Sequence, residues 1–386
     1  MKSHFHLLQI DLHLHDYKSV LSGFFTAFAV TLIIIPPVIL FFKRTGIFDM
    51  PGNRKLHSSP IPTMGGITII AGMVMASILW FPFSNDATWV CIFFSIAILA
   101  GLGIMDDLKD LSARYKFMVQ FALAAMIALS GLRITSFNGL FGVHHLPVTA
   151  QYIFTIIVIT GITNAFNLID GIDGLAAGMS FMSLITLGIF LNICNDSQSS
   201  FIAFALAGAV LAFLFFNTNP AKIFMGDTGS LVLGFVIAVL CTRLMQLNSG
   251  IVNPVLKHAS VFTLGIVLIP VFDTLRVFAL RIWRGKSPFA ADKTHIHHLL
   301  TNTGISHSLT TRLICSLHGL ILVEVYWLQK MKEEIVVAAL LVLMIVITLL
   351  FRNISVIYPV KNSFLSGLLK KKSNSFSDTE YNDPLL

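Results

Sequence analysis

Three acidic segments of the chain carry the residue types that bind a hard metal cation. Asp106 and Asp107 stand together at the end of an apolar run, and Asp170 and Asp173 lie in the turn Asp-Gly-Ile-Asp-Gly. Asp227 lies in a third segment, Gly-Asp-Thr-Gly-Ser. Carboxylates gathered against apolar helix ends are costly unless they are paired or bind a cation. Because Mg²⁺ takes one or two carboxylates together with phosphate oxygens, the pattern predicts phosphoryl chemistry.

Each acidic segment has a simpler interpretation when it is taken alone. An Asp-Asp pair at a helix end is usually a solvated cap, and Gly-Asp-Thr-Gly-Ser by itself is a weak signal. The Asp-Gly-Ile-Asp-Gly turn could belong to a calcium loop, but it lacks the spaced ligands and closing glutamate of an EF-hand. The functional hypothesis therefore depends on the three segments lying together.

A histidine-bearing loop adds a second set of candidate groups. The segment that begins at Arg281 contains His295, His297 and His298, together with Lys293 and other cations. These groups suit a pyrophosphate, since histidine can donate a hydrogen bond or act as a general acid near neutral pH. Two alternatives stay open: a transition-metal site, because His-x-His-His could place two imidazoles on one ion, and a solvated basic loop.

One acidic and one basic residue lie inside an apolar run. Asp273 and Arg276 are spaced i,i+3, which places them on one face of a helix. We interpret them as a buried structural pair. An aspartate that faces a substrate is the alternative, because ionisable residues inside membrane spans are often functional.

Membrane-spanning helices must position these groups. The chain has 386 residues, of which 55% are hydrophobic and only 12% charged, whereas a soluble domain has about 25% charged residues. About eleven apolar runs approach the length that crosses a bilayer as a helix. They are 20–42, 64–83, 88–105, 117–133, 149–166, 175–193, 200–217, 229–247, 258–280, 309–328 and 333–351. We therefore predict an all-α, polytopic integral membrane protein, with one multi-span domain over 1–351 and a poorly ordered tail over 352–386.

The distribution of lysine and arginine predicts the orientation of the spans. Basic residues gather in alternate loops, for example 43–55, 109–116 and 281–293, and the opposite loops hold few. The positive-inside rule then places the N-terminus in the periplasm and the C-terminus in the cytoplasm. It also explains the formal charge of +7 without a nucleic-acid partner. All three acidic segments and the histidine loop fall on the predicted cytoplasmic side, which is independent support for an active site in these loops.

Together the motifs resemble the polyprenyl-phosphate N-acetylhexosamine-1-phosphate transferases, which include the MraY and WecA types. The resemblance covers roughly residues 43–300 and rests on five elements in the family's order. They are Pro62-Thr-Met-Gly-Gly66, Asp106-Asp107, Asn167 to Gly174, Phe224 to Ser230, and His295-Ile-His-His298. Members of the family transfer a sugar 1-phosphate from a UDP-sugar to undecaprenyl phosphate and release UMP. The resemblance therefore implies an enzyme that depends on Mg²⁺, with Mn²⁺ as an alternative ion.

The resemblance also implies a role for each matching residue. Asp227 corresponds to the metal-ligating aspartate, and Asp107 is a candidate second ligand. Asp106 and Asp107 correspond to the pair beside the lipid phosphate, one of which serves as its base. The remaining matches are Asn167, Asp170, Asp173, Asn217 and Phe224 near the nucleotide, and His295, His297 and His298, with Lys293, near the pyrophosphate. The three histidines, Asp106, Asp107 and Asp227 are the candidate catalytic residues.

Two loops resemble the WecA type in particular. The histidine loop lacks the three consecutive histidines and acidic partner of the MraY type. The segment Arg54-Lys55-Leu-His57 is similar to a WecA pattern, which makes Arg54 and His57 candidate substrate-binding residues. Pro-Thr-Met-Gly-Gly instead reads like the MraY version, and we interpret it as shared scaffold.

The expected reaction is therefore transfer of N-acetylglucosamine 1-phosphate from UDP-N-acetylglucosamine to undecaprenyl phosphate in a bacterial inner membrane. It would initiate an envelope glycan such as O-antigen lipopolysaccharide. Open alternatives within the family are another UDP-N-acetylhexosamine and transfer of phospho-MurNAc-pentapeptide for peptidoglycan. An ion-coupled transporter is the alternative outside it, although its acids would lie near the bilayer midplane. A homodimer is also left open.

Overall fold

The apolar runs form helices in the computed structural model, which describes residues 14–46, 61–83, 86–137, 139–249, 254–287 and 294–357. The α-helices are α1 (Leu14–Thr45), α2 (Gly66–Trp80), α3 (Ala87–Lys109), α4 (Ala113–Leu129), α5 (Val148–Ile169), α6 (Leu175–Ile193), α7 (Ser197–Asn217), α8 (Gly226–Ser249), α9 (Ala259–Trp283), α10 (Ile296–Thr301), α11 (His307–Trp327) and α12 (Glu333–Ile357). Two short 3-10 helices are η1 (Leu140–Gly142) and η2 (Leu328–Lys330).

Every predicted span overlaps one of these helices, and the short α10 in the histidine loop was not predicted. In the described part of the chain, nine helices are long and apolar enough to cross a membrane. Helices α2 and α4, with 15 and 17 residues, are shorter. The all-α, multi-pass membrane fold is thus confirmed. The count of eleven spans, their orientation and the division into domain and tail stay predictions.

Polar residues at the turns start several helices. Asp86 accepts a hydrogen bond from the backbone N–H of Thr88 at 2.8 Å, where α3 begins. Ser112 and Ser306 act in the same way at the starts of α4 and α11. A side-chain oxygen at this position satisfies a donor that the first helical turn leaves unpaired. Side-chain caps therefore fix where α3, α4 and α11 begin.

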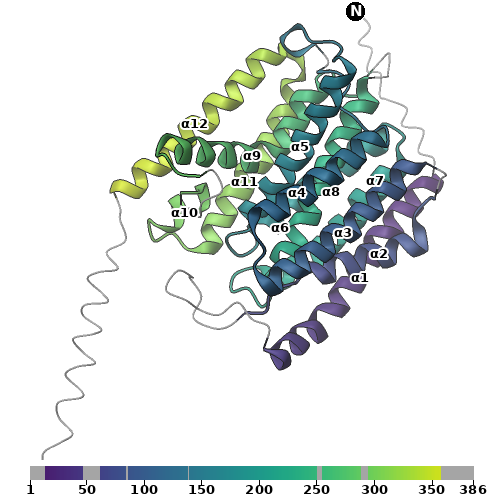
Figure 1. Ribbon diagram of the computed structural model, residues 1–386, viewed down its shortest axis with the longest axis vertical. Helices are drawn as coiled ribbons and strands as arrows, with labels where there is room; N and C mark the ends of the chain where they lie inside the picture. Colours follow the sequence, from purple (N-terminus) through teal and green to yellow (C-terminus); the bar gives the residue numbers. More distant parts are fainter. Residues whose placement is uncertain are drawn as a thin grey trace, which may run out of the picture.

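Helix α8 is the centre of the bundle. Of the residues in the most apolar stretch of α8, 83% are buried within the protein, compared with 22% for the corresponding stretches of α1 and α12. Figure 1 shows α1 and α2 at one edge and α12 at the opposite edge, with α5 and α8 between them. Large side chains of the outer helices, such as Phe25, Ile33 and Val342, are exposed. This arrangement fits outer helices that face lipid and a central helix that faces protein.

The first turn of α8 lies very close to α2 and α3. A Cβ atom on Gly66 would lie 2.1 Å from the backbone nitrogen of Gly229, and one on Gly103 would lie 2.3 Å from the Cα of Thr228. Only glycine fits at these distances, because any side-chain atom would overlap the backbone of α8. The N–H of Gly66 also donates a hydrogen bond to the carbonyl of Met225 at 2.8 Å. The start of α8 is therefore fixed between two helices.

Replacing Gly103 with alanine should lower the free energy of unfolding by about 1–3 kcal/mol, the usual range for overpacking. Gly101 is the matched control, because it lies in the same helix and a Cβ there meets no atom within 4 Å. Thermal unfolding of the two purified variants tests the difference. Gly101→Ala should unfold like the wild type, and equal loss of stability in both variants would contradict the close contact.

Candidate functional site

The carboxylate of Asp107, near the end of α3, caps the N-terminus of α8. Its Oδ1 accepts a hydrogen bond from the backbone N–H of Asp227 at 2.8 Å. Its Oδ2 accepts from the N–H and the hydroxyl of Thr228, at 3.2 and 2.6 Å. Gly226 has a φ of 72°, a left-handed conformation that lets the chain turn sharply into the helix. Because unpaired N–H groups and the helix dipole stabilise a carboxylate here, Asp107 fixes the position of Asp227.

Lys116, in the first turn of α4, links two of the predicted aspartates. Its Nζ lies 2.8 Å from Oδ2 of Asp106 and 2.8 Å from Oδ2 of Asp227. The three side chains are between 8% and 26% exposed, so water screens their attraction only in part. Asp106 also accepts a hydrogen bond from the N–H of Leu111 at 2.7 Å. Helices α3, α4 and α8 thus meet at one centre, which we call the ion-paired centre (Asp106, Lys116 and Asp227).

Asp173 and Asn217 hold the turn after α5 against the loop after α7. One carboxylate oxygen of Asp173 accepts a hydrogen bond from the N–H of Ala221 at 3.2 Å. The amide of Asn217, which is buried, accepts from the N–H of Gly174 at 3.0 Å and donates to the carbonyl of Ile223 at 2.9 Å. Both residues therefore connect backbone segments, and the prediction that they contact a nucleotide stays a prediction.

Asp170 experiences the negative charge of the other acidic residues. Burial, and then the charges of Asp227, Asp107 and Asp173, raise the pKa of Asp170 to about 8. The region therefore holds more carboxylates than the ammonium of Lys116 neutralises. A divalent cation relieves this kind of crowding.

The histidine loop is anchored to α9. Nη2 of Arg276 lies 2.6 Å from Oδ1 of Asp273, and Nδ1 of His295 lies 2.9 Å from Oδ2 of the same carboxylate. The N–H of Ile296, where α10 begins, also donates to Asp273 at 3.1 Å. The predicted pairing of Asp273 with Arg276 is confirmed, with Asp273 buried and Arg276 partly buried, and Asp273 positions His295 and the start of α10.

His297 is packed on the turn that follows α5. Its side chain is buried, and a Cβ on Gly171 would lie 2.3 Å from its Nε2. Burial, and then the charge of His298, lower the pKa of His297 to about 3, so the imidazole is neutral near neutral pH. Nδ1 of His297 has no hydrogen-bond partner among the described residues. This nitrogen is itself buried, so a ligand could hydrogen-bond to it only after a small movement of the imidazole.

One cavity of about 290 Å³ joins Lys116 of the ion-paired centre to the histidine loop. Asn167 of α5 lies on its wall and donates a hydrogen bond to the hydroxyl of Ser230 in α8 at 3.0 Å. Arg281 of α9 and the three histidines line the cavity as well. Within the described residues, no group of three or more carboxylate, imidazole or thiol side chains is placed to hold a metal ion by itself. An ion bound here would need further oxygen ligands from substrate and water.

The amino-acid sequence is similar to a known family of enzymes. A model described as glycosyl transferase family 4 matches residues 89–245. A probable undecaprenyl-phosphate N-acetylglucosaminyl 1-phosphate transferase of Bacillus subtilis (strain 168) is 36% identical over 296 residues, covering 76% of this chain and 81% of that protein. The chain belongs to glycosyl transferase family 4.

Further relatives are named undecaprenyl-phosphate alpha-N-acetylglucosaminyl 1-phosphate transferase. The protein of Yersinia pestis is 31% identical over 270 residues, which are 68% of this chain and 72% of the relative. The protein of Escherichia coli (strain K12) is 29% identical over 289 residues, which are 72% of this chain and 76% of the relative. The match to glycosyl transferase family 4 runs from α3 into α8, so it includes the whole ion-paired centre.

In this family 4 transferase, the structure brings most of the predicted site residues to one region. Phe224 lies at its edge, where its N–H donates to the carbonyl of Pro62 and its own carbonyl accepts from the N–H of Gly65, both at 2.8 Å. Pro62-Thr-Met-Gly-Gly66 thus supports the segment before α8, as expected of a scaffold. Three predicted substrate-binding residues lie outside the described residues: Arg54, His57 and Lys293.

Sequence reasoning did not single out Lys116 as a site residue. Lys116 was assigned to the basic side of the membrane, which accounted for it without a role in a site. The available signal for Lys116 was its place at the start of a span, ten residues after Asp106 and therefore at the same membrane face. Arg281 was included only among the cations of the histidine loop, and its place on the cavity wall depends on the packing of α9.

Replacing Lys116 with glutamine should lower the turnover of this transferase by roughly 100-fold or more, the usual effect of losing a charged group from such a centre. The loss would leave Asp106 and Asp227 as neighbouring unpaired charges. Lys109, an exposed lysine at the end of α3, is the matched control. Steady-state rates of both variants test this, and an active Lys116→Gln variant would exclude the assigned role.

Proposed function

We propose that the chain transfers N-acetylglucosamine 1-phosphate from UDP-N-acetylglucosamine to undecaprenyl phosphate, giving undecaprenyl-pyrophosphate-N-acetylglucosamine and UMP. One observation carries the proposal: the cavity that joins Lys116 of the ion-paired centre to three histidines. Phosphoryl transfer depends on positioning and charge neutralisation, and this cavity offers both. The names of the relatives from Bacillus subtilis, Yersinia pestis and Escherichia coli support the choice of sugar and acceptor.

The proposed reaction takes place on the cytoplasmic face of a bacterial inner membrane. The cavity lies at the start of α4 and at the ends of α5 and α9, the same side as the basic residues Lys43, Arg44 and Lys222. The positive-inside rule supports this orientation, with the N-terminus in the periplasm. The product would begin an envelope glycan such as O-antigen lipopolysaccharide.

The residues of the centre fit a Mg²⁺ ion, with Mn²⁺ as an alternative. The supporting observation is the raised pKa of Asp170, which is caused first by burial and then by the negative charges of Asp227, Asp107 and Asp173. Asp227 is the stronger candidate ligand, because both oxygens of Asp107 already accept hydrogen bonds from α8. When bound, such an ion neutralises charge on the pyrophosphate as UMP leaves.

The chain's own groups then have distinct tasks. Lys116 holds Asp106 and Asp227 in place, and with Arg281 it offers positive charge to phosphate oxygens in the cavity. Neutral His297 is available to hydrogen-bond the pyrophosphate. Asp106 orients the lipid phosphate or accepts its remaining proton, a small task because a phosphate monoester is largely ionised near neutral pH. A phosphate oxygen of undecaprenyl phosphate attacks the β-phosphorus of the UDP-sugar in line, and the bond to the UMP oxygen breaks.

Release of UMP from a panel of UDP-sugars tests the proposal. Purified protein with undecaprenyl phosphate and Mg²⁺ should release UMP fastest from UDP-N-acetylglucosamine, and only when the acceptor is present. Faster release from another UDP-N-acetylhexosamine or from UDP-MurNAc-pentapeptide would overturn the choice of sugar. No UMP from any donor, together with ion-driven uptake into proteoliposomes, would favour the transporter instead.

Asp227→Asn should lower UMP release by roughly 100-fold or more and leave thermal unfolding near that of the wild type. The amide keeps an oxygen that can accept from Lys116, which is why we expect the fold to persist. A covalent aspartyl-phosphate is the rival mechanism. Labelled β-phosphate that stays on the wild-type protein after quenching without acceptor would contradict direct attack.

A further inference from the structure

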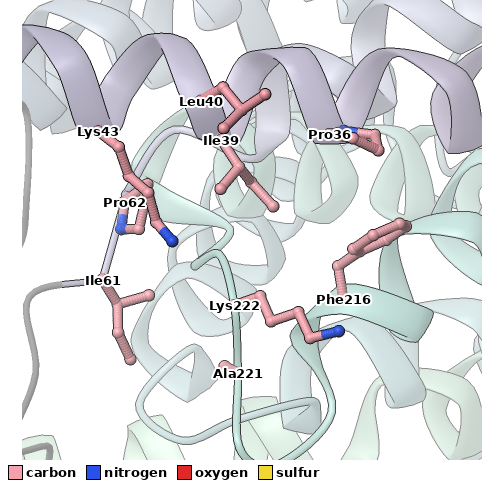
Figure 2. Close-up of a pocket in the computed structure, with 9 residues that line it drawn as sticks. All are labelled: Pro36, Ile39, Leu40, Lys43, Ile61, Pro62, Phe216, Ala221 and Lys222. Atoms are coloured by element: carbon pink, nitrogen blue, oxygen red, sulfur yellow. The ribbon is translucent and has the colours of Figure 1, made fainter.

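A second cavity lies between the end of α1 and the loop that follows α7. Its volume is about 450 Å³, and it shares no lining residue with the cavity of the proposed transfer reaction. Figure 2 shows Pro36 and Leu40 on α1 along one side and Phe216 on the other. We call this cavity, lined also by Lys43 and Lys222, the α1–α7 groove.

Among the described residues that line the groove, only Lys43 and Lys222 are charged. Lys43 extends from the last turns of α1 toward Pro62, and Lys222 extends toward the ring of Phe216 (Figure 2). Both side chains are exposed, and neither forms an ion pair within the part of the chain that the structure describes. The described part of the groove wall therefore carries a net positive charge and no carboxylate.

The floor of the groove is fixed by backbone hydrogen bonds. The N–H of Lys222 donates to the carbonyl of Phe216 at 2.7 Å, which closes the loop after α7. The N–H of Ala221 donates to Asp173 at 3.2 Å and ties the same loop to the turn after α5. The backbone of Lys222 is thus held in place before any ligand binds. The loop therefore loses less conformational entropy on binding than a flexible loop would lose.

The apolar side of the groove continues onto the lipid-facing surface of the bundle. Leu40 and Phe41 of α1 are 57% and 59% exposed, and Phe215 of α7 is 63% exposed. The lysines lie where α1 ends and just beyond the end of α7, at the level expected for headgroups. A molecule that fits both parts has an anionic head and long apolar chains. Lysines near a membrane surface attract such lipids.

We propose that the α1–α7 groove binds the headgroup phosphate of an anionic phospholipid from the surrounding leaflet. Lys43 and Lys222 contact the phosphate, and the acyl chains lie along Leu40 and Phe215. Phosphate oxygens accept charge-assisted hydrogen bonds from ammonium groups, which supplies the polar part of the affinity. This lipid is a bound component of the protein and not a substrate of the transfer reaction.

Native mass spectrometry of the full chain in detergent, titrated with phosphatidylglycerol, tests the proposal. Wild-type protein should retain one phosphatidylglycerol, and the double variant Lys43→Gln/Lys222→Gln should bind it at least about tenfold more weakly. Arg44→Gln is the matched control, because Arg44 is the next residue of α1, is exposed and does not line the groove. The charge-conserving variant Lys43→Arg/Lys222→Arg should retain the lipid, which separates lost charge from a damaged fold.

Four results would overturn the proposal. The glutamine double variant could bind phosphatidylglycerol as tightly as the wild type, or phosphatidylcholine could bind equally well, which would remove the role of charge. Undecaprenyl phosphate at equal concentration could displace phosphatidylglycerol, which would make the groove a site for the acceptor lipid. Inorganic phosphate could displace it equally well, which would show an anion site without a lipid.

Discussion

The hydrogen bonds between the Asp107 carboxylate and the first turn of α8 determine where the rest of the site can lie. They join the end of one helix to the start of the most buried helix, and close glycine contacts leave α8 no room to shift. Asp227, whose own N–H is part of this cap, therefore cannot move away from Asp106. Two ionised carboxylates in fixed proximity repel each other, and the ammonium of Lys116 lies between them and offsets that repulsion. The proposed chemistry follows from this constraint, because the same charges can hold a metal ion and a phosphate.

The acidic residues are placed at a cost to stability. Asp106 and Asp170 lie at the C-terminal ends of α3 and α5, where the helix dipole favours a positive charge. A sequence selected for stability alone would have lysine or arginine there. The carboxylate of the neighbouring Asp107 instead contacts the N-terminal end of α8, where the helix dipole favours a negative charge. Carboxylates held in an unfavourable electrostatic environment close to a cavity are typical of a functional site.

The sequence predicted the helices and the gathering of acidic segments, because hydropathy and the positive-inside rule depend on local composition. It did not predict which aspartate holds the scaffold and which is available for chemistry. The partners of Asp107 are about 120 residues away along the chain, and only packing brings them together. Lys116 was missed for the opposite reason, since the membrane topology already explained it. The first residue of the short α10 is held by a hydrogen bond to Asp273 in another helix, so the local sequence pattern did not predict α10.

The pH dependence of stability tests most directly whether crowded carboxylates organise this site. The pKa of Asp170 in the folded protein is raised from 3.8 to about 8, so its contribution to stability is fully present below pH 3.8 and is lost as the pH rises through about 8. Thermal unfolding of the wild type and of Asp170→Asn should be compared from about pH 5 to pH 9, in EDTA and in Mg²⁺. In EDTA the variant should gain stability relative to the wild type as the pH rises, and Mg²⁺ should remove that gain. A difference in stability that changes with neither pH nor Mg²⁺ would contradict the account.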